Sequence, residues 1–238
     1  MGNVASLAAV NTTLGAAAGA LSALFTESLL TYRLTGHVIY DTTATMNGCL
    51  TGLVAITAGC ATVYPWAGFV IGIVAGWLYL AGSRLLIKLR IDDAVDAIPV
   101  HLVGGMWGVI STGLFSNGTL IAAAGIGSDK HVGWFYTWSS NGDFTLLGIQ
   151  LLAVLWIFGW TSVTMGSYTW VLNYFGLLRV DPLMEDVGLD LSYHDNAAYN
   201  HEKIDRKKID ELSESRSVKK KRSGDGVRAE DDVSYDEE

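Results

Sequence analysis

The sequence predicts an all-α fold, a polytopic transmembrane helix bundle, and two observations carry this prediction. Half of the 238 residues are hydrophobic and only 17% are charged, whereas soluble domains carry about a quarter. The charges are also segregated, because Asp, Glu, Lys and Arg are all absent from four long stretches: Asn3–Thr26, Thr42–Ser83, Ala97–Ser128 and Phe144–Leu178. A helix needs about 20 apolar residues to cross a hydrocarbon core of about 30 Å, so these stretches are candidate spans.

Prolines divide the stretches into five expected helices. Pro65 splits the second stretch into two helices joined by a tight turn, Pro99 lies in the first turn of the next helix, and Pro182 follows the last one. We therefore expect a transmembrane region over residues 1–180, with spans at about 4–30, 43–62, 66–88, 97–116 and 145–177.

Basic residues in the short connections predict the orientation. Alternate connections carry Arg33, then Arg84, Lys88 and Arg90, then Arg179, whereas the intervening ones carry only Lys130. Because cytoplasmic loops are enriched in Lys and Arg, we expect the N-terminus outside and the C-terminus in the cytoplasm.

Glycines four residues apart recur in the expected helices and predict close helix packing. The sets are Gly48 with Gly52, Gly68 with Gly72 and Gly76, and Gly104 with Gly108. Small residues at this spacing let helix backbones approach each other in lipid, which favours a compact bundle. Cys49 and Cys60 would lie about 16 Å apart on one helix, too far for a disulfide, and are expected to be packed thiols.

His101 is the one histidine of five inside an expected span. An ionisable group in the bilayer is costly, so it usually faces the bundle interior or a cavity. The alternative is a structural histidine that bonds a backbone carbonyl of a neighbouring helix, and burial alone leaves both readings open. No phosphate loop, metal-binding cysteine pair or acid–base constellation accompanies His101, so we expect no enzyme, metal, cofactor or nucleic-acid partner.

Two long motifs resemble those of a known family. The stretch Asp92-Asp93-Ala94-Val95-Asp96-Ala97-Ile98-Pro99-Val100-His101-Leu102-Val103-Gly104-Gly105-Met106-Trp107-Gly108 resembles the tenth-helix signature of the ammonium transporter (Amt/Mep) family. The segments Gly176–Val180 and Glu185–Tyr199 are similar to its cytoplasmic C-terminal region, and Ala9–Thr13 and Met46–Val54 fit its seventh and eighth helices. The resemblance covers residues 4–199.

The resemblance implies an eleven-span bundle that forms trimers, with one pore in each subunit. In that family, ammonium is recruited outside and ammonia crosses an apolar pore lined by two histidines. His101 matches the second histidine, and Asp96 matches an acidic residue near the cytoplasmic exit. The implied partners are ammonium or ammonia, further transporter subunits and membrane lipid, and the implied location is the plasma membrane.

The five expected spans match only the family's helices seven to eleven. The first pore histidine and the outer aromatic residues of the family have no counterpart, so the pore is expected to be incomplete. Two hypotheses follow. In one, the chain conducts ammonium together with a missing half, as a piece of a longer protein; in the other, it is a half-length, non-conducting interaction subunit that modulates complete transporters.

The C-terminal region is expected to be regulatory. The resemblance implies a cytoplasmic control segment over residues 181–199 that includes Gly188, and Ser192 occupies a position that plant members phosphorylate. Residues 200–238 are rich in charge and are expected to be disordered. On the outer side, Asn117-Gly118-Thr119 is a glycosylation sequon just beyond a span end.

Overall fold

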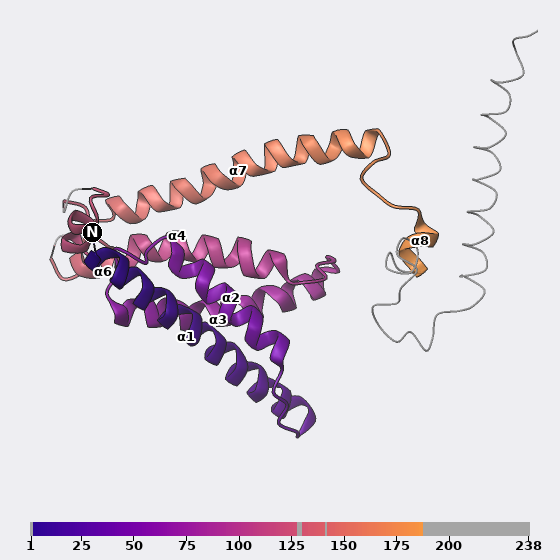
Figure 1. The fold of residues 1–238 in the computed structure, drawn as a ribbon, viewed down its shortest axis with the longest axis horizontal. Coiled ribbons are helices and arrows are strands. Elements are labelled where there is room, and N and C mark those ends of the chain that lie inside the picture. Colours follow the sequence, from indigo (N-terminus) through magenta and orange to yellow (C-terminus); the bar gives the residue numbers. More distant parts are fainter. Residues whose placement is uncertain (1, 128–129, 141, 188–238) are drawn as a thin grey trace, which may run out of the picture. The chain divides into compact units, whose positions relative to one another are not determined.

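The computed structural model describes residues 2–127, 130–140 and 142–187, and the regular structure in these ranges is entirely helical (Figure 1). The helices are α1 (Gly2–Thr35), α2 (Thr42–Thr57), α3 (Pro65–Leu89), the π-helix η1 (Ile98–Val103), α4 (Gly104–Phe115), α5 (Gly118–Ala124), α6 (Trp134–Thr137), α7 (Thr145–Tyr174) and α8 (Pro182–Val187). The chain divides into two compact units, Met1–Thr161 and Ser162–Glu238, and α7 runs across the boundary. This confirms the all-α class.

The first unit is built on close contact of α1 with α2 and α3, and glycines make this contact possible. The carbonyl oxygen of Gly19 on α1 lies between the other two helices. A Cβ added at Gly48 would lie 2.7 Å from this oxygen, and one added at Gly76 would lie 2.6 Å from it. The glycine spacing in the sequence therefore did indicate backbone contact. The matching pair on α1, Gly15 and Gly19, was not singled out in the sequence.

Helix α2 ends at Thr57, five residues before the expected end of the second span, and this prediction was wrong. The chain turns over Gly59–Val63, where the amides of Thr62 and Val63 bond the carbonyl of Gly59. Asn11 on α1 stabilises the turn, because its Nδ2 donates to the carbonyls of Cys60 and Val63, both at 2.8 Å. Carbonyls released from a helix need such partners, and the partner here is distant in sequence.

Four helical segments in the described ranges are long and apolar enough to cross a membrane: Asn3–Thr35, Pro65–Leu89, Ile98–Phe115 and Thr145–Tyr174. Each contains or closely matches an expected span. Helix α2 has 16 residues and is about 24 Å long at 1.5 Å per residue, shorter than a typical hydrocarbon core. The four candidate spans indicate an integral membrane protein, and α2, where the second span was expected, is not among them.

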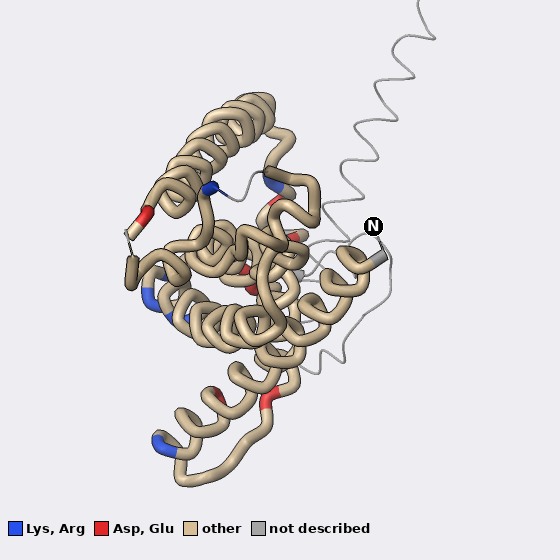
Figure 2. The backbone as a smooth tube through the Cα atoms, turned by 90° about the vertical axis from the view of Figure 1, so that its left-hand side faces the viewer, with Lys and Arg blue, Asp and Glu red and all other residues tan. Residues whose placement is uncertain are grey.

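Charged residues lie mainly in the connections and towards helix ends, and the helices are mostly tan, the colour of uncharged residues, in Figure 2. Asp41 caps α2 by accepting the amides of Thr43 and Ala44 at 2.8 and 3.0 Å. Arg84 on α3 forms an ion pair of 2.5 Å with Glu27 on α1. This pair lies towards the ends of α1 and α3 that are far from the turn bonded by Asn11. Arg84 is 45% exposed, so this pair contributes little to stability in water-like surroundings.

The second unit contains the end of α7, a turn and α8. Gly176 has a φ of 68°, a left-handed conformation that ends a helix readily at glycine. Arg179 then bonds both carboxylate oxygens of Glu185 at 2.9 Å. These two residues belong to the segments that resemble the family's C-terminal region.

Candidate functional site

The expected fourth span begins as a π-helix, and His101 lies within it. Helix η1 covers Ile98–Val103 and continues directly into α4. A π-helix closes each turn with one residue more than an α-helix, and such turns occur frequently at functional sites. The π-helix could not be predicted from the sequence, because a six-residue segment is too short for its periodicity to separate π from α.

His101 lies on the exposed side of the π-helix. Pro99 and Val100 are buried, and Pro99 packs on α3, where a Cβ added at Gly82 would lie 3.3 Å from the Pro99 Cβ. His101 and Leu102 follow on the exposed face. Within the described part of the chain, the His101 side chain makes no hydrogen bond. The described residues therefore do not support the alternative in which His101 is a structural histidine bonded to a backbone carbonyl of a neighbouring helix.

The two glycines after His101 have different surroundings. Gly104 is buried against α2, where an added Cβ would lie 2.9 Å from Thr51 Cγ2. Gly105 is more open, since its nearest neighbour would be Val54 Cγ1 at 3.9 Å. Gly104 thus allows close helix packing, and Gly105 leaves the surface beside His101 without a side chain.

Asp93 caps the π-helix. Its carboxylate oxygens accept the amides of Ala97 at 2.9 Å and Ile98 at 2.7 Å. These amides, first that of Ile98 and then that of Ala97, lower the pKa of the Asp93 carboxyl below its usual value. The capping pattern is one that a sequence reading can find, because Asp is a favoured residue just before a helix.

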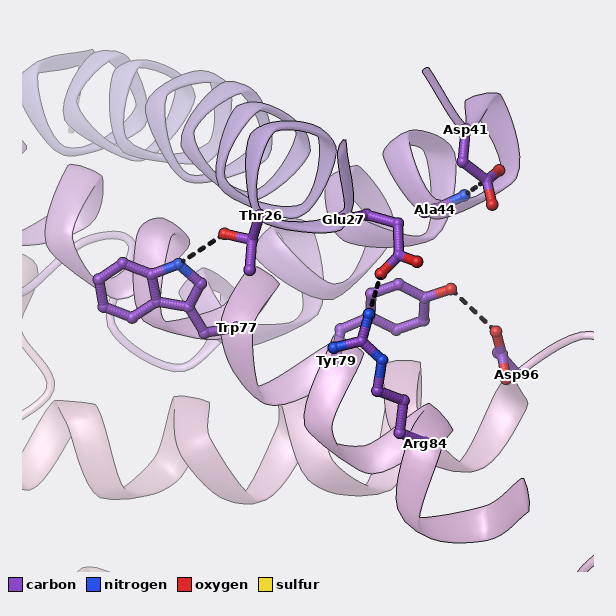
Figure 3. Close-up of polar contacts among 8 residues, drawn as sticks. All are labelled: Thr26, Glu27, Asp41, Ala44, Trp77, Tyr79, Arg84 and Asp96. Carbon is purple, nitrogen blue, oxygen red and sulfur yellow. Dashed lines mark hydrogen bonds and ion pairs between the residues drawn. The ribbon is translucent and has the colours of Figure 1, made fainter. Parts of the chain in front are cut away.

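Asp96 is held by side chains from two other helices. Its Oδ2 accepts the Tyr79 hydroxyl of α3 at 2.8 Å and Asn47 Nδ2 of α2 at 3.5 Å, and its Oδ1 accepts Ser83 Oγ of α3 at 3.0 Å. Figure 3 shows the bond between Tyr79 and Asp96, with the Glu27–Arg84 pair nearby. The carboxylate is thus directed at the bundle, and Asp96 and His101 share a segment without bonding each other.

The opposite end of α3 and α4 carries aromatic side chains that the sequence reading did not single out. Trp66 packs edge-on against Phe115 with ring centres 5.8 Å apart, and Phe135 lies 5.3 Å from Trp66. Trp134 stacks on Trp138 at 4.9 Å and on Phe144 at 5.1 Å. These rings join the loop between α4 and α7 to the helix ends, and the Tyr64-Pro65-Trp66 turn is the signal that would have pointed to them.

The remaining predicted residues divide into described and undescribed ones. Asn117 caps α5, since its Oδ1 accepts the amide and the hydroxyl of Thr119 at 3.0 and 2.7 Å, and its glycosylation stays a prediction. Gly188 and Ser192 lie outside the described residues. Cys49 and Cys60 are free thiols, as expected. Among the described residues, no group of three His, Cys, Asp or Glu is placed to hold a metal ion.

Comparisons with known proteins found a matching family and similar sequences. The family model described as Ammonium Transporter Family matches residues 1–199. Ammonium transporter 1 member 1 of Solanum lycopersicum is 37% identical over 194 residues, which are 82% of this chain and 38% of that protein. A putative ammonium transporter of Synechocystis is 40% identical over 192 residues, covering 81% of this chain and 37% of that one.

Solved structures agree with the sequence matches. Mep2 of Saccharomyces cerevisiae superimposes with a TM-score of 0.63 and 28% identity, over 75% of this chain and 38% of that chain. A structure named Sensor Amt Protein superimposes with a TM-score of 0.62 and 29% identity, over 79% of this chain and 42% of that chain. This chain therefore spans about two fifths of the length of the proteins that it matches.

Proposed function

This chain belongs to the Ammonium Transporter Family, and from that membership we propose that it forms one wall of an ammonium pathway in which ammonia passes His101. The family consists of transporters and channels, not enzymes. The chain spans 38% of its tomato relative, so the opposite wall of the pathway is assigned to sequence present in complete subunits. The proposal also includes assembly as a homotrimer in the plasma membrane. It further includes regulation of transport through Gly188 and Ser192.

The observation that carries the proposal is the position of His101. It lies in an apolar span, on the exposed side of a π-helix, without a hydrogen-bond partner among the described residues. A side chain as polar as imidazole is rarely left towards lipid, so a further element or a water-filled path is expected beside it. A neutral imidazole offers one donor and one acceptor, which suits contact with ammonia and passage of a proton.

The same geometry limits what this chain does alone. His101 is exposed, whereas its neighbours Pro99 and Gly104 lie against α3 and α2. A pathway needs a second wall, which in the proposal comes from the remainder of a complete subunit. The competing role, a half-length subunit that modulates complete transporters, has no described contact of its own that favours it.

The test is His101→Ala in a complete subunit that contains this sequence. The proposal expects ammonium current per surface trimer to fall about a hundredfold or more, the scale of losing a side chain that transfers protons. Trimer yield should remain unchanged, and His101→Glu should keep part of the current while admitting other cations. His37→Ala, at an exposed histidine outside the spans, is the matched control. Equal current per trimer in His101→Ala would remove the pathway role.

A further inference from the structure

The π-helix that carries His101 is fixed at both ends. At its beginning, the amides of Ala97 and Ile98 bond the Asp93 carboxylate, Pro99 has no amide hydrogen, and the Val100 amide bonds the Asp96 carbonyl at 3.1 Å. The first amides of the segment are thus all accounted for. At its end, α4 lies against α2, where a Cβ at Gly108 would approach the Ala55 carbonyl oxygen to 2.6 Å.

We propose that Asp96 is a positioning residue, whose carboxylate ties the start of the π-helix to α2 and α3 and thereby sets the direction of the His101 imidazole. The inference rests on the proposed function only in taking His101 to lie beside the ammonia pathway. The orientation itself is a property of this chain.

The bonds that Asp96 accepts from α2 and α3, here called the tether, have a fixed direction. The two donors on α3 lie one helical turn apart. Tyr79 and Ser83 are four residues apart on α3 and so lie on the same face. Each takes a different oxygen of Asp96, at 2.8 and 3.0 Å, so the carboxylate is held at two points and cannot turn about one of them. Tyr79 is only 3% exposed, so this attachment belongs to the packed part of the bundle.

The backbone at Asp96 passes the constraint on to the helix. Asp96 has a φ of 57°, a left-handed conformation that Asp tolerates better than most residues. The chain bends there and enters the π-helix within two residues. With the far end held by α4, the rotation of the residues between is fixed, and His101 is one of them.

Three substitutions separate the tether from the charge and from the backbone bend. Asp96→Gly keeps the left-handed bend and removes the carboxylate. Asp96→Asn removes the charge but keeps the bonds, because the Ser83 hydroxyl can accept from an amide as well as donate. Tyr79→Phe removes the bond at 2.8 Å and leaves Asp96 itself intact. Trp77→Phe, on the same helix as Tyr79, is the matched control, because it removes the bond of 3.1 Å that Trp77 Nε1 donates to Thr26 Oγ1 of α1.

The experiment measures the direction of His101 without measuring transport. The full 238-residue chain, purified in detergent, is treated with diethylpyrocarbonate, and the modification of His101 relative to the exposed His37 is read by mass spectrometry. In the wild type the His101 imidazole lies on the exposed side. A variant in which this imidazole can rotate should therefore show a lower ratio. In Asp96→Gly and Tyr79→Phe we expect a fall of about threefold, the factor that one hydrogen bond of ordinary strength gives. Asp96→Asn and Trp77→Phe should keep the wild-type ratio.

Two results would overturn the inference. One is an unchanged ratio in Asp96→Gly and Tyr79→Phe, which would mean that the tether does not orient His101. The other is an equal fall in all four variants, which would indicate general loosening of the bundle. If the expected pattern appears while His101→Ala leaves ammonium current intact, the positioning holds and the proposed function fails, so the two are separable.

Discussion

Asp143 shows how a single carboxylate can fix the start of a long helix. The side chain and amide of Thr145, and then the His131 side chain, lower the pKa of Asp143 to about 2 from 3.8. A lowered pKa means that the ionised form stabilises the folded loop. This contribution is complete above pH 3.8 and is lost as the pH falls through about 2.

We therefore expect Thr145→Val to raise the pKa of Asp143 towards 3.8, because the hydroxyl is the largest cause of the shift. His131→Ala should raise it less, since His131 is 52% exposed and its pair with Asp143, at 3.1 Å, is open to solvent. Carbon NMR of the Asp143 carboxyl during an acid titration measures both. A larger rise in His131→Ala than in Thr145→Val would contradict this order.

At the scale of helices, glycine contacts decide how α1, α2, α3 and α4 approach. Gly108→Ala puts a methyl group against the backbone of Ala55, at 2.6 Å from its carbonyl oxygen, where no side chain can move aside. We expect a loss of stability of about 1–3 kcal/mol, as for other overpacked sites. Thermal unfolding of the purified protein measures it.

Gly148→Ala is the matched control for Gly108→Ala. It is a helical glycine on α7 with nothing within 4 Å of an added Cβ. Alanine is the better helix former by about 1 kcal/mol, so this change should leave stability equal or slightly higher. A stability loss of the same size in both variants would show that the contact with Ala55 is not the cause.

The sequence predicted the helices well where the signal was local. Charge-free stretches and the three prolines placed α1, α3, α4 and α7, because apolar length and the missing proline amide act within one segment. The early end of α2 was missed because its cause is Asn11, about fifty residues away. The same limit applies to the site. His101 stood out as a polar residue in an apolar span, but its π-helix and the tether of Asp96 depend on α2 and α3.

For the whole molecule, the distribution of basic residues makes a prediction about topology. We expect Lys130 outside and Arg90 and Ser215 inside, because the Lys and Arg of the short connections gather on one side. Single cysteines at these positions, in a chain whose Cys49 and Cys60 are replaced, can be labelled in intact cells. An impermeant reagent should label position 130 alone. Labelling at position 215 would reverse the orientation.

The last prediction concerns transport by this chain alone. Residues 1–238 should not restore growth of an uptake-deficient yeast on low ammonium, because under the proposed function the chain forms only one wall of the pathway, and His101 is exposed. The chain spans 38% of its tomato relative. The complete subunit containing this sequence should restore growth, and surface expression of both proteins must be equal. Robust growth with residues 1–238 would mean that two copies can form a pathway from identical walls. In that case His101→Ala in the 238-residue chain should abolish growth, since both walls would then lose their only span histidine.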